Sequence, residues 1–169
     1  YDIAVSFKPS QPDTGSGLYR RSLYTYWKQT APAPMMTTLD ASKRDVCRVR
    51  REKTDSPLQA LVMLNSPQFA EAARVLGADL VARHAGDDEA LITEAFRLMT
   101  SRRPSEREWP ILRTLYDEQL AHFRETPDEA AKLLAAGQHP PSETADPTRT
   151  AAVTVLVLTL LNFDECTSK

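Results

Sequence analysis

The sequence is poor in cysteine, with only Cys47 and Cys166 among its 169 residues. Two cysteines so far apart exclude the closely spaced pairs of zinc sites, the C-x-x-C of thiol redox proteins and the C-x-x-C-H of covalent haem attachment. The chain therefore carries no c-type haem of its own, and we expect no cofactor in it. One disulfide between the two would suit an oxidising compartment, but sequence spacing does not decide whether it forms.

Glycine is also scarce, with five residues against twelve prolines. Few positions can then adopt positive φ easily, whereas many prolines can mark the ends of helices, so the balance favours helices over hairpins. Long hydrophobic runs are missing too. The longest, residues 151–161, is shorter than the roughly 20 residues of a membrane span, and no signal-peptide pattern is present. We expect a soluble piece of a longer protein with no membrane span.

A strong excess of either charge is lacking, because the net charge is only −2. The two parts of the chain nevertheless differ. Up to Ala60 there are ten Lys and Arg against six Asp and Glu, and after it eleven against seventeen. Such a division can orient a partner or draw the two parts together. The absence of an overall basic excess argues against nucleic acid as a partner.

Signals for helix starts and stops become dense after residue 55. Two Ser-Pro pairs, at 56–57 and 66–67, put a capping residue before a proline in the first helical position, and Gly86 and Gly137 supply stops. Later start signals are Asp87 with Asp88, Ser105 with Glu108, Thr126 with Glu129, and Asp146 before Pro147. The sequence predicts a mainly α protein, a bundle of five to six helices after an irregular or extended N-terminal segment.

The last predicted helix, from Asp146 to about residue 161, is apolar almost all round. A helix with no polar face belongs in the middle of a bundle. We therefore expect this helix to be the most buried, with Leu156→Ala or Leu160→Ala costing about 2 to 5 kcal/mol of stability.

The segment before residue 56 has weaker signals. Residues 1–17 are predicted to be a linker from an upstream domain, followed by a single domain over 18–169, divided into an irregular basic and aromatic part (18–55) and a helical bundle (56–169). We predict an extended stretch at 18–27 and no helix through the prolines of "APAPMM" at 31–36. Pro110 predicts either a bend or a start about one turn after Ser105 for its helix.

Arginines and aromatic residues are concentrated in the same N-terminal part. Arginine forks can bind carboxylate, sulfate or phosphate, and aromatic rings stack on sugars and on arginine. The candidate anion- or partner-binding residues are Arg20, Arg21, Arg48, Arg50, Arg51, Tyr24, Tyr26 and Trp27. The alternative is purely structural, with the arginines paired to interleaved acids and the rings covering the bundle.

Catalytic and metal motifs are missing. The sequence has no G-x-S-x-G, Walker A or G-x-G-x-x-G pattern, and the spacing of His84, His122 and His139 fits no metal site. The adjacent acids Asp164 and Glu165 are typical of a solvated terminus rather than of an acid-base pair. We expect no catalytic residue and no metal in this chain, which leaves open whether it contributes to an enzyme.

Several long segments resemble a known family in the correct order: "RRSLYTYWKQTAPAPMMTTLDASKRDVCRVRREKTDSPLQALVMLNSPQFAEAA", "AFRLMTSRRPSEREW", "LLAAG" and "LLNFDE". Over about residues 17–166 the chain resembles the C-terminal domain of unknown function of planctomycete-type exported surface proteins. The resemblance implies an extracytoplasmic or cell-surface location and a cytochrome c-like module, with its haem, elsewhere in the protein. It supplies no catalytic residues.

Three hypotheses follow. The first is a non-catalytic module whose partner is the remainder of its own polypeptide, contacted through residues 18–54. The second is a module that binds an anionic, sulfated glycan through the arginines and aromatic residues named above. In the third, the domain completes a polysaccharide-active site shared with an upstream domain, with Asp40 or Asp45 as an acid.

Overall fold

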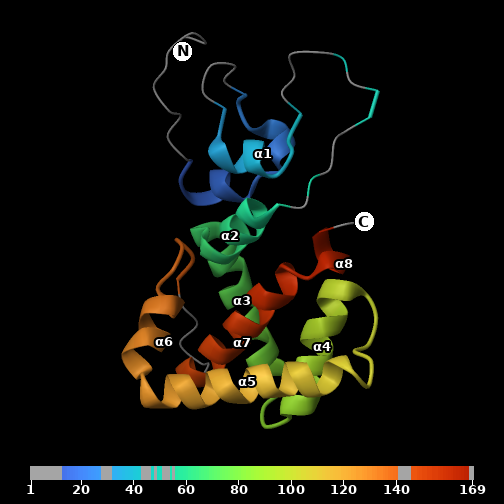
Figure 1. Ribbon diagram of the computed structural model, residues 1–169. Helices are drawn as coiled ribbons and strands as arrows, with labels where there is room; N and C mark the ends of the chain where they lie inside the picture. The colour runs from blue at the N-terminus through green and yellow to red at the C-terminus, as the bar shows by residue number, and fades with distance from the viewer. Residues whose placement is uncertain are drawn as a thin grey trace. The chain divides into compact units, whose positions relative to one another are not determined.

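The computed structural model describes residues 13–27, 32–42, 47, 49–50, 54, 56–140 and 146–167. By its contacts the chain divides into two compact units, Tyr1–Val62 and Met63–Lys169, which we describe separately. Every regular element in the described residues is a helix (Figure 1), so the predicted mainly α fold with an irregular N-terminal segment is confirmed. Across the described ranges, no helix combines the length and apolar character needed to cross a membrane.

The described part of the first unit consists of short helical turns. Its elements are the 3-10 helices η1 (Gly15–Tyr19) and η2 (Ser22–Tyr24), α1 (Pro34–Thr38) and most of α2 (Pro57–Asn65). The predicted extended stretch at 18–27 is therefore wrong in detail. The expectation that no helix passes through the prolines of "APAPMM" is confirmed, because α1 begins at the second of them, Pro34. Proline suits that first position, where the missing N–H has no intrahelical partner.

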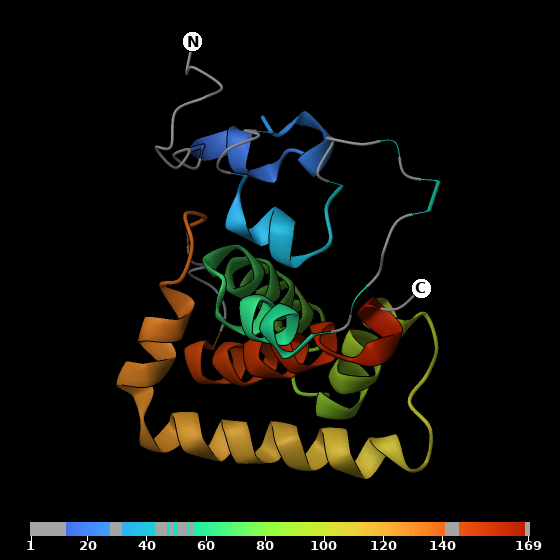
Figure 2. The ribbon, with the colours of Figure 1, turned by 45° about the horizontal axis from the view of Figure 1, so that its top comes forward.

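The second unit is a bundle around one helix. Its elements are α3 (Pro67–Arg83), α4 (Asp88–Thr100), α5 (Glu108–Glu125), α6 (Pro127–Leu134), α7 (Pro147–Leu161) and the short α8 (Asp164–Thr167). Each of the others contacts α7, most extensively α3 and α5. Figures 1 and 2 show α7 lying inside the arrangement, with α5 running along one side of it.

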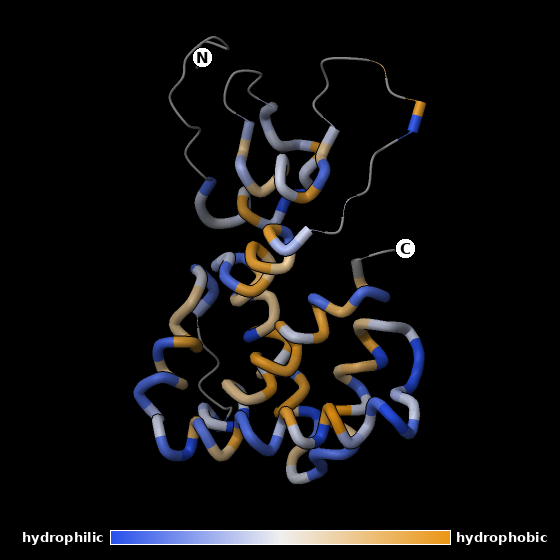
Figure 3. The backbone as a smooth tube through the Cα atoms, viewed as in Figure 1, coloured by the Kyte–Doolittle hydropathy of each residue, from blue (hydrophilic) through white to orange (hydrophobic). Residues whose placement is uncertain are grey.

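Burial confirms the predicted place of α7. Leu156 is fully buried and Leu160 is 3% exposed, and the apolar character of the helix is visible along its length in Figure 3. On the α3 side, a β-carbon added at Gly77 would lie 3.3 Å from Thr154 Oγ1 and 3.5 Å from the Thr150 carbonyl oxygen. A glycine at this position lets α3 approach the backbone of α7 closely.

The predicted helix starts are largely confirmed. Asp146 Oδ1 accepts hydrogen bonds from the amides of Thr148 and Arg149, and Asp87 Oδ1 accepts one from Ala90. These carboxylates satisfy amides that have no partner within their own helix.

Two other start signals have different outcomes. Ser105 and Glu108 exchange the predicted capping-box bonds. The helix α5 begins at Glu108, which confirms the later start predicted as one of the two alternatives for Pro110, so this proline falls in the first turn and breaks no helical hydrogen bond. The predicted capping box at Thr126 is wrong. Its hydroxyl donates back to the His122 carbonyl oxygen at 2.8 Å, and Glu129 pairs with the His122 ring at 3.0 Å instead.

Candidate functional site

In the first unit, three side chains spread over 19 sequence positions form a polar cluster that we call the clasp: Asp40, Thr54 and Gln59. The Thr54 amide donates to Asp40 Oδ2 at 2.6 Å, and the Thr54 hydroxyl lies 2.8 and 2.9 Å from the two carboxylate oxygens. Gln59 Nε2 donates to Asp40 Oδ2 at 3.1 Å and to Thr54 Oγ1 at 3.0 Å. The clasp thus joins the end of the α1 region to the segment that leads into α2.

Local backbone geometry supports the clasp. Asp40 has φ +56°, a left-handed conformation that aspartate tolerates better than most residues. Gln59 is 6% exposed, and its Oε1 accepts from the Ser56 amide at 2.9 Å, completing a capping box at the start of α2. The Asp40 carboxylate accepts hydrogen bonds from backbone and side-chain donors, which gives it a structural role in the clasp.

Four large apolar or aromatic side chains near the start of the chain are exposed; we call them the aromatic surface. Tyr19 is 61% exposed, Leu23 70%, Tyr24 66% and Tyr26 57%. They lie on η1, on η2 and directly after η2, where amides of Arg20, Tyr24 and Thr25 bond to carbonyls three residues earlier. The hydrogen bonds of these 3-10 turns fix the backbone conformation of the segment.

The 3-10 geometry explains one contact within this segment. Residues three apart lie on the same side of a 3-10 helix, and the Arg21 guanidinium carbon lies 6.0 Å from the centroid of the Tyr24 ring. This separation is at the outer limit for a cation-π contact. Arg21 and Tyr24 are therefore neighbours, and their use in binding stays a prediction.

The other predicted site residues differ in exposure, and some lie outside the described residues. Arg20 and Arg50 are exposed, and Trp27 is half-buried. Arg48 and Arg51 lie outside the described residues, as does Asp45. Convergence of the arginines on one anion stays a prediction.

The second unit contains a charged cluster that sequence reasoning missed. Arg102 donates to both oxygens of Glu108, at 2.7 and 2.8 Å, and to both oxygens of Glu165, at 2.7 and 2.9 Å. Its guanidinium carbon also lies 4.9 Å from the centroid of the Phe96 ring. These hydrogen bonds raise the pKa of Arg102 and hold the pKa values of both glutamates below their ordinary range. Arg102 thereby connects the start of α5 to α8.

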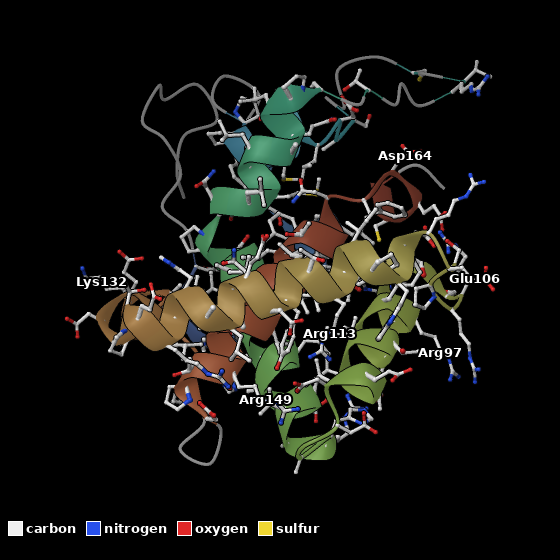
Figure 4. The ribbon with its side chains drawn as sticks, turned by 60° about the horizontal axis from the view of Figure 1, so that its bottom comes forward. Arg97, Glu106, Arg113, Lys132, Arg149 and Asp164 are labelled. Carbon is white, nitrogen blue, oxygen red and sulfur yellow. The ribbon has the colours of Figure 1, made fainter. Side chains whose placement is uncertain are left out.

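A second missed cluster lies where α4, α5 and α7 meet. The fully buried Tyr116 donates its hydroxyl to Asp88 Oδ1 at 3.0 Å, and Arg149 donates to the same oxygen from Nε and from a terminal nitrogen, at 3.0 and 2.6 Å. Arg149 also donates to the His84 carbonyl oxygen at 3.0 Å. Burial, as the main cause, raises the pKa of Tyr116. Figure 4 shows Arg149 beside this junction. The bonds satisfy buried polar groups and position the helices.

The loop after α6 is held by two charged residues of α3. Glu71 Oε2 accepts from the amides of Gln138 and His139, and Arg74 donates to the carbonyl oxygens of His139 and Pro140, at 2.5 and 3.4 Å. Glu71 is 6% exposed and Arg74 is 2% exposed. Buried charges are tolerated here because backbone groups of the loop bind them.

Neither metal-binding nor disulfide chemistry is visible in the described part of the chain. Within those ranges no group of three or more His, Cys, Asp and Glu side chains could hold a metal ion. His84 pairs with Glu94 and His122 with Glu129. Cys47 and Cys166 are not joined by a disulfide, and Cys166 Sγ lies 3.4 Å from the Met99 carbonyl oxygen.

A family model described as PSD1, protein of unknown function (DUF1553), matches residues 3–116. The chain belongs to the PSD1 family. The match spans the aromatic surface, the clasp and the helices up to the middle of α5, whereas the "LLAAG" and "LLNFDE" segments of the sequence resemblance lie beyond it. Comparison with curated proteins and with solved structures gave no match.

Proposed function

We propose that this PSD1 domain is a non-catalytic interaction module whose aromatic surface contacts the remainder of a longer polypeptide. The observation that carries the proposal is the exposure of Tyr19, Leu23, Tyr24 and Tyr26, each more than half accessible within eight residues. Scattered single apolar residues on a surface are ordinary, but a concentration of large apolar side chains indicates an interaction site.

Energetic considerations support this use of the segment. Burial of a large apolar side chain contributes about 1.5 to 3 kcal/mol, and tyrosine is enriched at protein interfaces because it combines a large ring with a polar tip. Arg20 and Arg21, both exposed between these side chains, add donors for carboxylates or carbonyls on a partner. The 3-10 turns already order the segment, which lowers the entropy lost on docking.

The setting of this module is part of the proposal. On the resemblance described above, we place it in a planctomycete-type protein that is exported to an extracytoplasmic or cell-surface location. A cytochrome c-like module with its haem would lie elsewhere in that polypeptide.

A triple variant tests the module hypothesis: Leu23→Ser, Tyr24→Ser and Tyr26→Ser. Because these side chains are exposed, the urea midpoint of the present chain should stay within the range of ordinary surface substitutions. In the longer polypeptide the same changes should increase limited proteolysis between this domain and its neighbour. A matched control is Ile111→Ser, an exposed apolar residue of α5 (69%). Equal proteolysis of variant and wild type in the longer polypeptide would refute the proposal.

Recognition of an anionic, sulfated glycan is the second candidate, and the contact between Arg21 and Tyr24 favours it. A sugar face could lie on the ring while sulfate binds nearby guanidinium groups. Salt-sensitive retention of the chain on a sulfated polysaccharide column is the expected behaviour. Retention should fall for Arg20→Ala/Arg21→Ala and for the triple variant Arg48→Ala/Arg50→Ala/Arg51→Ala. Unchanged retention of both variants would remove this candidate.

A further inference from the structure

The outer side of α4 borders a shallow groove of about 660 Å³ within the second unit. Its lining comes from α4 and from residues just before and after it: Asp87, Glu89, Ala90, Thr93, Glu94, Arg97, Leu98 and Arg103. The opposite side of α4 carries Leu91, Ile92, Ala95 and Phe96, all buried in the core. Figure 4 shows Arg97 projecting away from the bundle.

Charge along this groove is ordered by sequence position. The acidic residues Asp87, Glu89 and Glu94 occupy its first part, and Arg97 and Arg103 occupy its last part. A helix favours acids near its N-terminus and bases near its C-terminus, because these charges complement the helix dipole. That preference explains how the order arises, and the order gives the groove one negative end and one positive end.

A groove with this polarity is complementary to itself. If two copies meet about a two-fold axis across α4, the helices run antiparallel and the negative end of each faces the positive end of the other. With the axis near residue 95, Arg97 of one copy comes opposite Glu94 of the other. On the same side of α4, Ala90 and Thr93 line the groove with small side chains, which lets the helices approach closely.

We propose that the α4 groove is a self-association surface that takes a second copy of this chain. Leu98, 48% exposed at the edge of the groove, supplies apolar contact beside the ion pairs. Glu94 is held in position by Arg83, at 2.5 Å, and by His84. This preorganisation reduces the side-chain entropy lost when Arg97 of the second copy approaches.

The expected association is weak and sensitive to salt. One helix face per copy buries less area than a standard interface, so the dimer belongs with small, transient contacts. Its attraction depends largely on exposed charges, which are screened over about 10 Å at 0.1 M salt and over about 3 Å at 1 M. The self-association surface is separate in sequence from the aromatic surface and does not depend on the proposed function.

Sedimentation equilibrium of the chain, with a charge-reversal pair, tests this proposal. The wild type should show a monomer–dimer equilibrium that weakens at high salt. Arg97→Glu/Arg103→Glu should weaken the dimer about tenfold or more, corresponding to at least about 1.4 kcal/mol. The reverse variant, Glu89→Arg/Glu94→Arg, should also lose self-association. An equimolar mixture of the two variants should form a heterodimer, because the charged groove residues are then all acidic in the first variant and, apart from Asp87, all basic in the second.

A matched control reverses two exposed arginines outside the groove, Arg107→Glu/Arg124→Glu, and should dimerise like the wild type. Circular dichroism of each variant shows whether it is folded. If a charge-reversal variant does not fold, the milder substitution Arg97→Gln takes its place in the experiment. Wild-type protein that stays monomeric at about 1 mM would overturn the proposal. Dimers unaffected by Arg97→Glu/Arg103→Glu, or variants that fail to associate on mixing, would overturn it equally.

Discussion

Arg102 and Glu165 are 63 positions apart in the sequence and form a two-pronged ion pair, with nitrogen–oxygen distances of 2.7 and 2.9 Å. The same guanidinium binds both oxygens of Glu108. One arginine therefore joins the start of α5 to α8, and planar guanidinium geometry makes this double pairing possible.

Replacement of Arg102 should destabilise the second unit. We expect Arg102→Gln to lower the thermal unfolding midpoint, because Glu108 and Glu165 lose their ion-pair partner and the Phe96 ring loses its cation-π contact. Arg103→Gln, a neighbouring exposed residue, is the control and should have little effect. The measurement is thermal unfolding followed by circular dichroism. Equal midpoints for the two variants would contradict the role assigned to Arg102.

The cluster also predicts a pH dependence. Hydrogen bonds from Arg102, then from Ser105, hold the pKa of Glu108 below its ordinary value of 4.5. The folded form stays ionised while the unfolded chain takes up a proton near that value, so the stabilisation is full above about pH 5.5 and is lost as the pH falls.

Urea unfolding of wild type and Glu108→Gln tests this dependence. The stability difference between them should be largest near neutral pH and should shrink below pH 4.5. Glu106→Gln, at an exposed position two residues earlier, is the control. A difference that stays constant down to pH 3 would rule out the proposed protonation effect.

Gly137 and Gly86 provide a matched test of the loop held by Glu71. Both have positive φ, +93° and +89°, but a β-carbon at Gly86 meets open space, whereas one at Gly137 would collide with the Glu71 side chain. Gly86→Ala should cost about 1 kcal/mol, from backbone strain alone. Gly137→Ala should cost about 1 to 3 kcal/mol more, because the buried Glu71 must move. Urea midpoints measure both, and similar costs would contradict the close approach of this loop to α3.

Local patterns made much of this fold predictable. The Ser-Pro pairs, the cap at Asp146 and the glycine at 137 are signals carried within a few residues, and the apolar α7 reveals its burial by composition alone. Long-range partners have no such signal. The sequence shows Asp164 and Glu165 as exposed acids, which they are, but nothing local indicates that Arg102 binds Glu165. Likewise, Asp40, Thr54 and Gln59 become partners only when the chain folds back.

In the first unit, a local sequence pattern predicted the wrong secondary structure. A stretch rich in aromatic residues such as 18–27 suits a strand when neighbouring strands exist to pair with it. Among the described residues there are none, and the segment instead forms single 3-10 turns. The exposure of Tyr24 and Tyr26 likewise depends on packing, which the sequence pattern does not contain.

Among substitutions of aliphatic residues of α7 by alanine, Leu156→Ala should produce the largest loss of stability. The residue is fully buried at the centre of the bundle, and Leu156→Ala should cost about 2 to 5 kcal/mol. Thr159→Ala, at an exposed position of the same helix, should change stability by about 0.5 kcal/mol or less. Urea unfolding at neutral pH compares them. A small effect at Leu156 would mean that α7 is not the core helix.

Tyr116→Phe removes only the hydroxyl that donates to Asp88. Since Asp88 keeps its ion pair with Arg149, the expected loss of stability is about 1 to 2 kcal/mol.

The raised pKa of Tyr116 adds a pH dependence of stability. The unfolded chain loses the phenolic proton near 10 while the folded chain retains it, so stability should decline as the pH rises above 10. Absorbance titration checks this, with Tyr26→Phe as the exposed control. If Tyr116→Phe removes part of the absorbance change near pH 10 in the folded protein, the burial argument fails.

The central claim is that residues 19–26 form a docking surface rather than part of a core. The most direct measurement is hydrogen exchange of this segment, followed by mass spectrometry, in the present chain and in the longer polypeptide. We predict fast exchange in the chain and exchange slowed about tenfold or more in the longer protein, with α7 strongly protected in both. Equal exchange rates of residues 19–26 in the two proteins would contradict the claim.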